Sequence, residues 1–177
     1  MTISLYDASV ASYMQIVPAV SALLDKAAEH FPAQGMDLGQ IVDARLHEGM
    51  LPFRFQVVSV VHHSIGTIKA MDSGIFSPPK YDASLDFENL RAVLATATAE
   101  LAALSADEVN LKSGKALAFV MGDLNLPFTT ENFVLSFSLP NFYFHAATTY
   151  DILRHLGLPL GKRDFMGRLR ITRQPKA

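Results

Sequence analysis

The chain has 177 residues, a length that favours one domain with a substantial core, so we expect residues 1–177 to form a single domain. Half of the residues are hydrophobic, 18% are charged and the formal net charge is −2, which excludes a disordered chain and offers no overall basic surface for nucleic acid. The absence of cysteine excludes disulfides and thiolate metal ligands.

The longest uncharged stretch, residues 132–150, is too polar for a bilayer core, since it contains serine, asparagine, histidine and threonine. The N-terminus has no basic segment ahead of an apolar run, as a secretory signal would have. We therefore expect a cytoplasmic protein that binds neither membrane nor nucleic acid.

Helical periodicity begins at once. Residues 5–30 repeat apolar side chains at helical spacing, and Pro18 is expected to kink or split this helix. A shorter helical piece follows near residue 38. Pro52 can occupy the first turn of a second long helix over 52–72.

The stretch DSGIFSPPKYDAS has the composition of a loop, and a third long helix is expected over residues 84–104 with Ser84 as its N-cap. KALAFVMGDLNLPFTT then reads as a small β-hairpin. Thr129 or Thr130 can cap a fourth long helix that runs to Leu156 and ends at Gly157. The pattern predicts an all-α fold: an up-down four-helix bundle with one hairpin before the last helix and an irregular basic tail over 158–177.

Two polar stripes interrupt the apolar faces of the second and fourth helices. Their members are Gln56, Ser59, His63 and Thr67 on the second helix, and Asn141, His145, Thr148 and Thr149 on the fourth. In a bundle such stripes converge on the core or on a cavity, and buried polar groups need partners.

His63 and His145 are the candidate centre of this region, with Asn141 beside them. The two imidazoles are suited to one divalent metal, but an amide oxygen is a weak third ligand. His62 points about 100° away from His63 and is not expected to join the same site. A hydrogen-bonded core pair and a metal-free pocket for a small molecule are the two alternatives.

Three stretches, FQVVSVVHHSIG, LLDKAAEH and above all PNFYFHAATTYDILRHLGLPLGKRDFMG, carry a resemblance. The chain resembles a bacterial family known as a domain of unknown function, grouped with the DinB/YfiT-like helical bundles, a superfamily that includes metalloenzymes. The similarity covers essentially the whole chain.

The resemblance implies a divalent metal, zinc, nickel or iron, held by three histidines: one on the second helix and two, four residues apart, on the last. His63 and His145 match two of these positions, whereas Asn141 stands at the third. This departure implies either a modified metal site, completed by Asn141, Gln56 or water, or a site that has lost its metal.

Two functions follow. In one, the chain is a metal-dependent enzyme of the thiol-transferase type, and Lys162, Arg163, Arg168 and Arg170 neutralise an anionic thiol cofactor. In the other, it is a non-catalytic scaffold or small-ligand-binding protein. In both, the many aromatic residues favour a homodimer.

Overall fold

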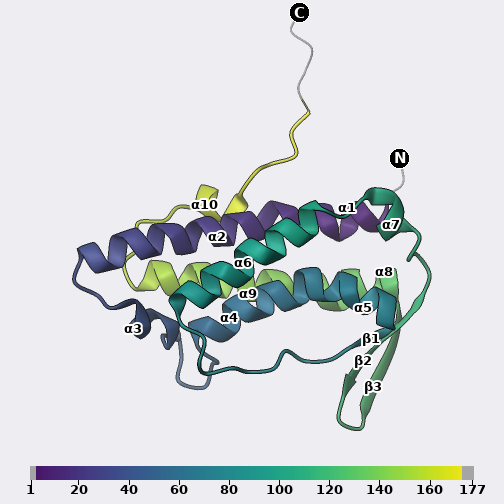
Figure 1. Ribbon diagram of the computed structural model, residues 1–177, viewed down its shortest axis with the longest axis horizontal. Helices are drawn as coiled ribbons and strands as arrows, with labels where there is room; N and C mark the ends of the chain where they lie inside the picture. The colour runs from purple at the N-terminus through teal and green to yellow at the C-terminus, as the bar shows by residue number, and fades with distance from the viewer. Residues whose placement is uncertain (1–2, 173–177) are drawn as a thin grey trace, which may run out of the picture.

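The computed structural model describes residues 3–172 and shows a mostly helical chain with a small sheet near one end of the helices (Figure 1). The α-helices are α1 (Leu5–Ala8), α2 (Val10–Ala33), α3 (Leu38–Val42), α4 (Phe53–Val61), α5 (Thr67–Ser73), α6 (Phe87–Ala102), α7 (Ala106–Asn110), α8 (Thr130–Phe133), α9 (Leu139–His155) and α10 (Lys162–Met166). Two segments, η1 (His62–Gly66) and η2 (Val134–Ser138), are π-helical, and the strands are β1 (Ile75–Phe76), β2 (Ala116–Met121) and β3 (Leu124–Thr129). The predicted mainly helical fold is confirmed. Within the described residues, no helix has the length and apolar character needed to cross a bilayer.

The core lies between α2, α6, the composite helix α4–η1–α5 and the composite helix α8–η2–α9. The segment α4 packs against both α6 and α9, and α2 packs against the same two helices. Large side chains from all of these segments are fully buried, among them Tyr13, Phe53, Leu94, Phe133 and Phe142. Removing this apolar surface from water is the main stabilising contribution to the fold.

The predicted first helix is two helices that meet at Ser9. Ser9 has φ −100° and ψ −84°, outside the helical region, and its hydroxyl donates to the Leu5 carbonyl at 2.6 Å. Pro18 lies inside α2, which continues to Ala33. The interruption is therefore nine residues earlier than the proline that the sequence pattern pointed to.

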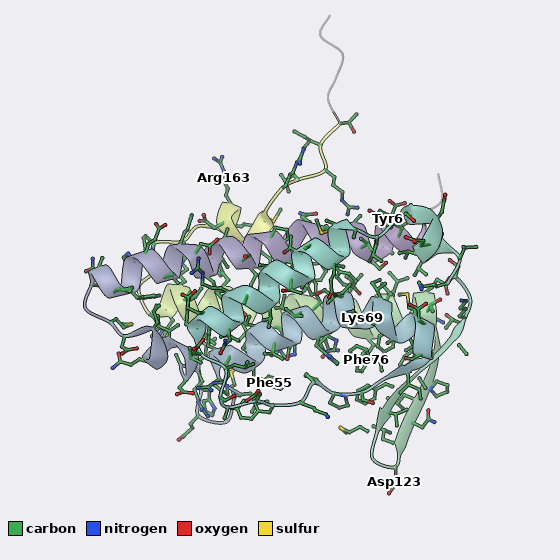
Figure 2. The ribbon with its side chains drawn as sticks, in the orientation of Figure 1. Tyr6, Phe55, Lys69, Phe76, Asp123 and Arg163 are labelled. Carbon is green, nitrogen blue, oxygen red and sulfur yellow. The ribbon has the colours of Figure 1, made fainter. Side chains whose placement is uncertain are left out.

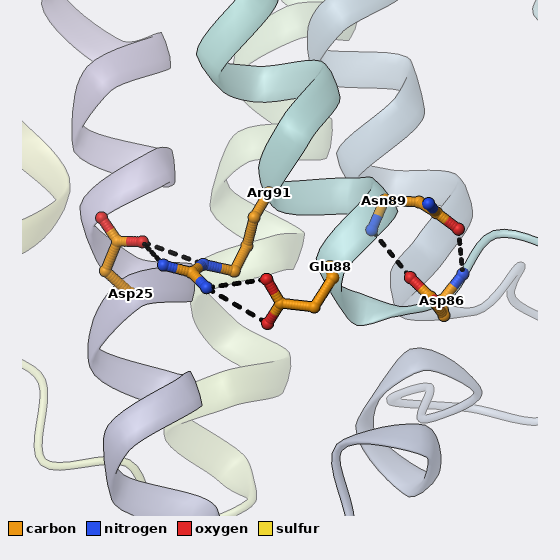
Figure 3. Close-up of polar contacts among 5 residues, drawn as sticks. All are labelled: Asp25, Asp86, Glu88, Asn89 and Arg91. Atoms are coloured by element: carbon orange, nitrogen blue, oxygen red, sulfur yellow. Dashed lines mark hydrogen bonds and ion pairs between the residues drawn. The ribbon is translucent and has the colours of Figure 1, made fainter.

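The third long helix, α6, begins later than predicted. Asp86 is its N-cap: the Asp86 carboxylate accepts from the Asn89 backbone N–H at 2.7 Å, and the Asn89 side chain accepts from the Asp86 N–H at 3.1 Å (Figure 3). The predicted cap, Ser84, instead bonds to Asp82. The prediction of Ser84 was wrong because Asp86 and Asn89 form a reciprocal capping box that Ser84 cannot match.

One ion-pair cluster joins α6 to α2. The Arg91 guanidinium lies 2.8 Å from Asp25 on α2 and 2.8 Å from Glu88 on its own helix (Figure 3). All three side chains are solvent-exposed, so each pair contributes about 0–1 kcal/mol. Apolar packing rather than this cluster holds the two helices together.

The predicted hairpin is present, and a third strand extends it. Strands β2 and β3 are antiparallel and turn at Gly122, whose φ of +57° suits glycine. Strand β1 pairs parallel to β2, with Ile75 opposite Ala118. It lies in the stretch predicted as loop, where burial of Phe76 and pairing to β2 order a segment whose composition favours a turn.

The last long helix ends as predicted, and the tail is less irregular than expected. Thr129 caps α8, and Gly157 follows α9 with φ 103°. The tail then forms α10, which lies along α2: the Gln15 side chain donates to the Met166 carbonyl at 3.0 Å, and Lys26 pairs with Asp164. Residues 173–177 of the predicted basic tail lie outside the described residues.

Candidate functional site

The structure brings His63 and His145 together from facing helices. His63 lies on η1 and is buried, whereas His145 lies on α9 and is half-buried. Their ring centroids are 5.8 Å apart and their planes differ by 15°. The two predicted polar stripes therefore meet at His63 and His145.

Gln56 determines which nitrogen of His145 carries the proton. The Gln56 amide nitrogen donates to the Leu51 carbonyl at 2.8 Å, so its oxygen faces His145 as an acceptor. The His145 Nδ1–H then donates to this oxygen at 2.7 Å. The lone pair of His145 is consequently on Nε2, the arrangement by which a neighbouring acceptor prepares a histidine for metal binding.

Asn141 does not join this contact. Its amide nitrogen donates to the Phe137 carbonyl at 2.7 Å, one turn back on the same helical segment. Among the side chains of Gln56, His63, Asn141 and His145, only those of Gln56 and His145 are hydrogen-bonded to each other in the described part of the chain. Asn141 lies one helical turn before His145, but the hydrogen bond to Phe137 holds its side-chain amide against its own helix.

The other predicted pocket-lining residues are buried, and three of them bond to backbone carbonyls of their own helices. Thr67 donates to the carbonyl of His63, Thr148 to that of Phe144 and Thr149 to that of His145. Ser59 is fully buried, and its hydroxyl has no hydrogen-bond partner among the described residues. Of the five predicted lining residues, Gln56 alone bonds to a histidine side chain.

A buried hydroxyl cluster holds the backbone of His63 in place. The Ser138 hydroxyl, at the end of η2, donates to the His63 carbonyl at 2.6 Å. Ser138 in turn lies 2.7 Å from the Tyr13 hydroxyl and 2.8 Å from the Thr67 hydroxyl. Burial raises the pKa of Tyr13, so its hydroxyl stays protonated and donates to Ser138. The cluster joins α2, the π-helical turn η1 and the π-helical turn η2, and π-helical turns occur frequently at functional sites.

Both histidines are neutral at physiological pH. Burial lowers the pKa of His63 to about 3, with smaller contributions from His62 and His145. Burial also lowers the pKa of His145 to about 4. The buried Nδ1 of His63 has no hydrogen-bond partner among the described residues. The site thus presents two neutral imidazoles, the form in which histidine binds metals.

Four phenylalanines surround the histidine pair. Phe55 and Phe144 contact His145, with ring centroids at 5.8 and 5.2 Å, and Phe76 and Phe137 contact His63 at 5.3 and 6.0 Å. Sequence reasoning missed this shell. A signal was available, since Phe55 and Phe144 directly precede Gln56 and His145 in the chain.

The donor set fits a divalent ion in part. Two imidazoles that bind one ion at about 2.1 Å place their ring centres about 5–6 Å apart, which agrees with the observed 5.8 Å. The Nδ1 of His63 is buried and has no hydrogen-bond partner among the described residues. No group of three or more histidine, aspartate, glutamate or cysteine side chains within residues 3–172 is arranged to hold an ion, so a third strong ligand is missing from that part of the chain.

His62 lies nearer to the pair than its helical phase predicted: its ring centroid is 5.5 Å from that of His63, with the planes at 80°. Its Nε2 lies 2.7 Å from the Ser77 carbonyl, and its ring packs on Phe76 at 4.3 Å. His62 therefore ties the loop after β1 to η1.

The predicted anion-binding residues lie away from the histidines. Lys162 and Arg163 are on α10, and Arg168 and Arg170 follow it beside α2. Figure 2 shows Arg163 at one edge of the molecule, whereas Phe55 and Phe76 lie toward the opposite edge. Anion binding by this segment stays a prediction, but it is not part of the histidine site.

Comparison with known proteins supplies the family. Residues 5–166 match the family described as "Domain of unknown function (DUF1993)". The chain belongs to this family. A crystal structure of a DinB family member from Shewanella denitrificans matches with a TM-score of 0.79 and 23% identity over 96% of each chain. This likeness shows that the fold is DinB-like. No curated protein matches the chain.

Proposed function

We propose that this DinB-like protein binds one divalent metal ion, zinc, nickel or iron, through His63 and His145. The observation that carries the proposal is the hydrogen bond from His145 Nδ1–H to Gln56, beside a second neutral imidazole whose ring centre is 5.8 Å away. This contact leaves Nε2 of His145 as a ligand without any change of protonation. In this proposal, the four long helical segments act as an up-down bundle that carries the site.

Each residue has a distinct role. His63 and His145 hold the ion, Gln56 orients His145, and the hydroxyl cluster around Ser138 positions the backbone of His63. Asn141 adds its amide oxygen as a further ligand only when its side chain turns away from the Phe137 carbonyl, to which its nitrogen is bonded. With two strong protein ligands, half of the positions of a tetrahedral ion are left to weaker ligands, water or substrate; structural sites leave no position open, whereas catalytic sites do.

We infer that the reaction is of the thiol-transferase type, which the resemblance to the DinB-like superfamily supports. A bound divalent ion supplies a lowered pKa to a thiol or water. The phenylalanine shell limits access of bulk water to the histidines. We further propose that the protein is cytoplasmic and forms a homodimer, consistent with its exposed apolar side chains such as Leu135 and Phe144.

A metal-free function is the second candidate, and the orientation of Asn141 favours it. Because its amide bonds to its own helix, the residue at the third ligand position is not poised toward either histidine. The same architecture then acts as a scaffold or small-ligand-binding protein, with His63 and His145 as neutral pocket residues.

Metal titration of the untagged protein separates the two candidates. Elemental analysis and calorimetry with Zn²⁺, Ni²⁺ and Fe²⁺ are expected to show one ion per chain, with binding lost in His63→Ala and His145→Ala. His155→Ala, at an exposed histidine in the last turn of α9, is the matched control and is expected to bind normally. Absence of binding to the parent protein, or equal binding by all three variants, refutes the metal proposal.

A further inference from the structure

We propose that a cavity under the loop of residues 77–86 binds a small monocarboxylate with an apolar body. The cavity has a volume of about 320 Å³, at the small end of the range of about 300–1,000 Å³ for small-molecule sites. It lies between α6, the helical segment α4–η1–α5 and the loop, which runs along that segment (Figure 1). Neither His63 nor His145 lines it, so the inference does not rest on a bound metal.

Two side chains fasten the loop over the cavity. The His62 Nε2–H donates to the Ser77 carbonyl at 2.7 Å, and the guanidinium of Arg54 donates to the Ala83 carbonyl. Arg54 is 8% exposed and also pairs with Asp43, so its charge is compensated away from the cavity. The loop therefore forms a fixed outer wall between these two contacts.

The interior of the cavity is apolar, and its mouth is cationic. Only two of the lining residues, Lys69 on α5 and Lys80 in the loop, are solvent-exposed, so they mark the mouth. The apolar side chains of the walls are buried or half-buried: Val58, Val61, Ile65, Leu85 and Val93. An apolar group that enters is removed from water against these side chains, which favours binding.

The two lysines differ in how far their charges are already compensated. The Lys69 ammonium lies 2.6 Å from the Glu100 carboxylate, and Glu100 lines a neighbouring groove rather than this cavity. Lys80 forms no ion pair within residues 3–172. Lys80 is thus the cation that a carboxylate at the mouth can pair with at full charge.

No acidic side chain among the described residues lines the cavity. The two acids of the loop are exposed and otherwise bonded: Asp82 accepts from Ser84, and Asp86 caps α6 by accepting from Asn89. Burial lowers the pKa of His62, so the imidazole adds no charge at neutral pH. An ammonium group therefore finds no partner in the cavity, whereas a carboxylate does.

Gly66 supplies an independent reason to expect a ligand. Its φ of −60° and ψ of −36° are ordinary helical values, and glycine inside a helix is less stable than alanine. The three atoms nearest to a Cβ built there all belong to the His62 ring, the closest at 3.4 Å, which is normal contact. Neither backbone conformation nor packing thus requires glycine. Its missing side chain instead leaves space in the wall of the cavity, which Gly66 lines.

Three probes test the class of ligand on metal-free protein from which the chelator has been dialysed. Benzoate carries both the carboxylate and an apolar ring, benzamide has the same shape without the charge, and acetate has the charge without the ring. Calorimetry is expected to show benzoate binding about fivefold tighter than benzamide and at least about tenfold tighter than acetate. Methyl NMR shifts are expected at Val61, Ile65 and Leu85. Absence of benzoate binding, shifts elsewhere, or equal binding of benzamide overturns the inference.

Two lysines provide a matched pair of variants. Lys80→Gln is expected to bring the affinities for benzoate and benzamide to within about twofold of each other. Lys115→Gln makes the same change of net charge at an exposed lysine that lines the neighbouring groove, and is expected to keep the preference for benzoate. Equal effects of the two substitutions overturn the inference.

Filling the cavity from Gly66 tests the site itself. Gly66→Ala is expected to weaken benzoate binding at least about threefold, while urea unfolding shows a protein at least as stable as the parent. Gly66→Leu is expected to abolish benzoate binding, with the melting temperature as the check that it folds. A less stable Gly66→Ala protein, or unchanged benzoate affinity in folded Gly66→Leu, overturns the inference.

Discussion

The hydroxyl of Ser138 is expected to contribute about 2–3 kcal/mol to the free energy of unfolding. Ser138 is fully buried and donates to the His63 carbonyl at 2.6 Å, while it accepts from the Tyr13 hydroxyl at 2.7 Å. Ser138→Ala removes a buried hydrogen bond and leaves the Tyr13 hydroxyl without its acceptor. A lost bond costs about 1 kcal/mol, and a stranded buried donor costs about 1–3 kcal/mol.

Urea unfolding of three proteins measures this contribution. Ser136→Ala is the control, since Ser136 is exposed and bonds only to the Asn132 carbonyl of its own helix; its effect is expected to be within about 0.5 kcal/mol. For a chain of this size, a loss of 2–3 kcal/mol lowers the melting temperature by roughly 4–12 °C.

A double-mutant cycle then tests the cause. Tyr13→Phe removes the donor that Ser138→Ala strands, so the double variant is expected to be more stable than the sum of the single changes predicts, by about 1 kcal/mol or more. Strict additivity, or a loss below about 0.5 kcal/mol in Ser138→Ala, would show that the cluster does not fasten the π-helical turns.

Three further predictions concern acid stability, the tail and a helix cap. The pKa of His63 is about 3 in the folded protein and about 6.5 in the unfolded chain, so the contribution of neutral His63 to the free energy of unfolding is fully present above pH 6.5 and falls by about 3 kcal/mol at pH 4. Urea unfolding in the presence of chelator should therefore depend less on pH for His63→Gln than for the parent protein. Parallel pH profiles would contradict this. Gly167→Ala should free the segment after α10, seen as faster amide exchange, because φ is +59° there and a Cβ would meet the Gln15 carbonyl oxygen of α2. Gly161→Ala, whose Cβ has ordinary contacts, should not do so, and equal exchange in both variants would refute the clash. Asp86→Ala should cost about 1 kcal/mol in urea unfolding and Ser84→Ala almost nothing, and the reverse order would restore Ser84 as the cap.

Much of the site was predictable from spacing along the chain. Gln56 and His63 are seven residues apart, which places them on one face of a helix, and the apolar residues around them indicate that this face is buried. The same reasoning places His145 on the buried side of the last long helix. Two polar stripes in one small helical domain must meet near the core, and the structure confirms that His63 and His145 do so.

Spacing could not assign the partners of these side chains. Asn141 has the phase predicted for a ligand, yet its amide bonds to the Phe137 carbonyl, a choice that depends on a side-chain rotamer. Gln56 rather than Asn141 reaches His145, because α4 and α9 pack at a particular height relative to each other. Sequence periodicity contains no information about that height.

The amino-acid sequence by itself determined the helical class, the hairpin, the end of α9 at Gly157 and the residues that supply the two imidazoles, because local backbone preference and burial periodicity act over a few residues. Only the tertiary structure decided the two π-helical turns, the strand β1 and the shell of phenylalanines around the histidines. These features arise from contacts between segments far apart in the chain, such as Ser138 with Tyr13, 125 residues away, and their energy is gained only when the helices have packed.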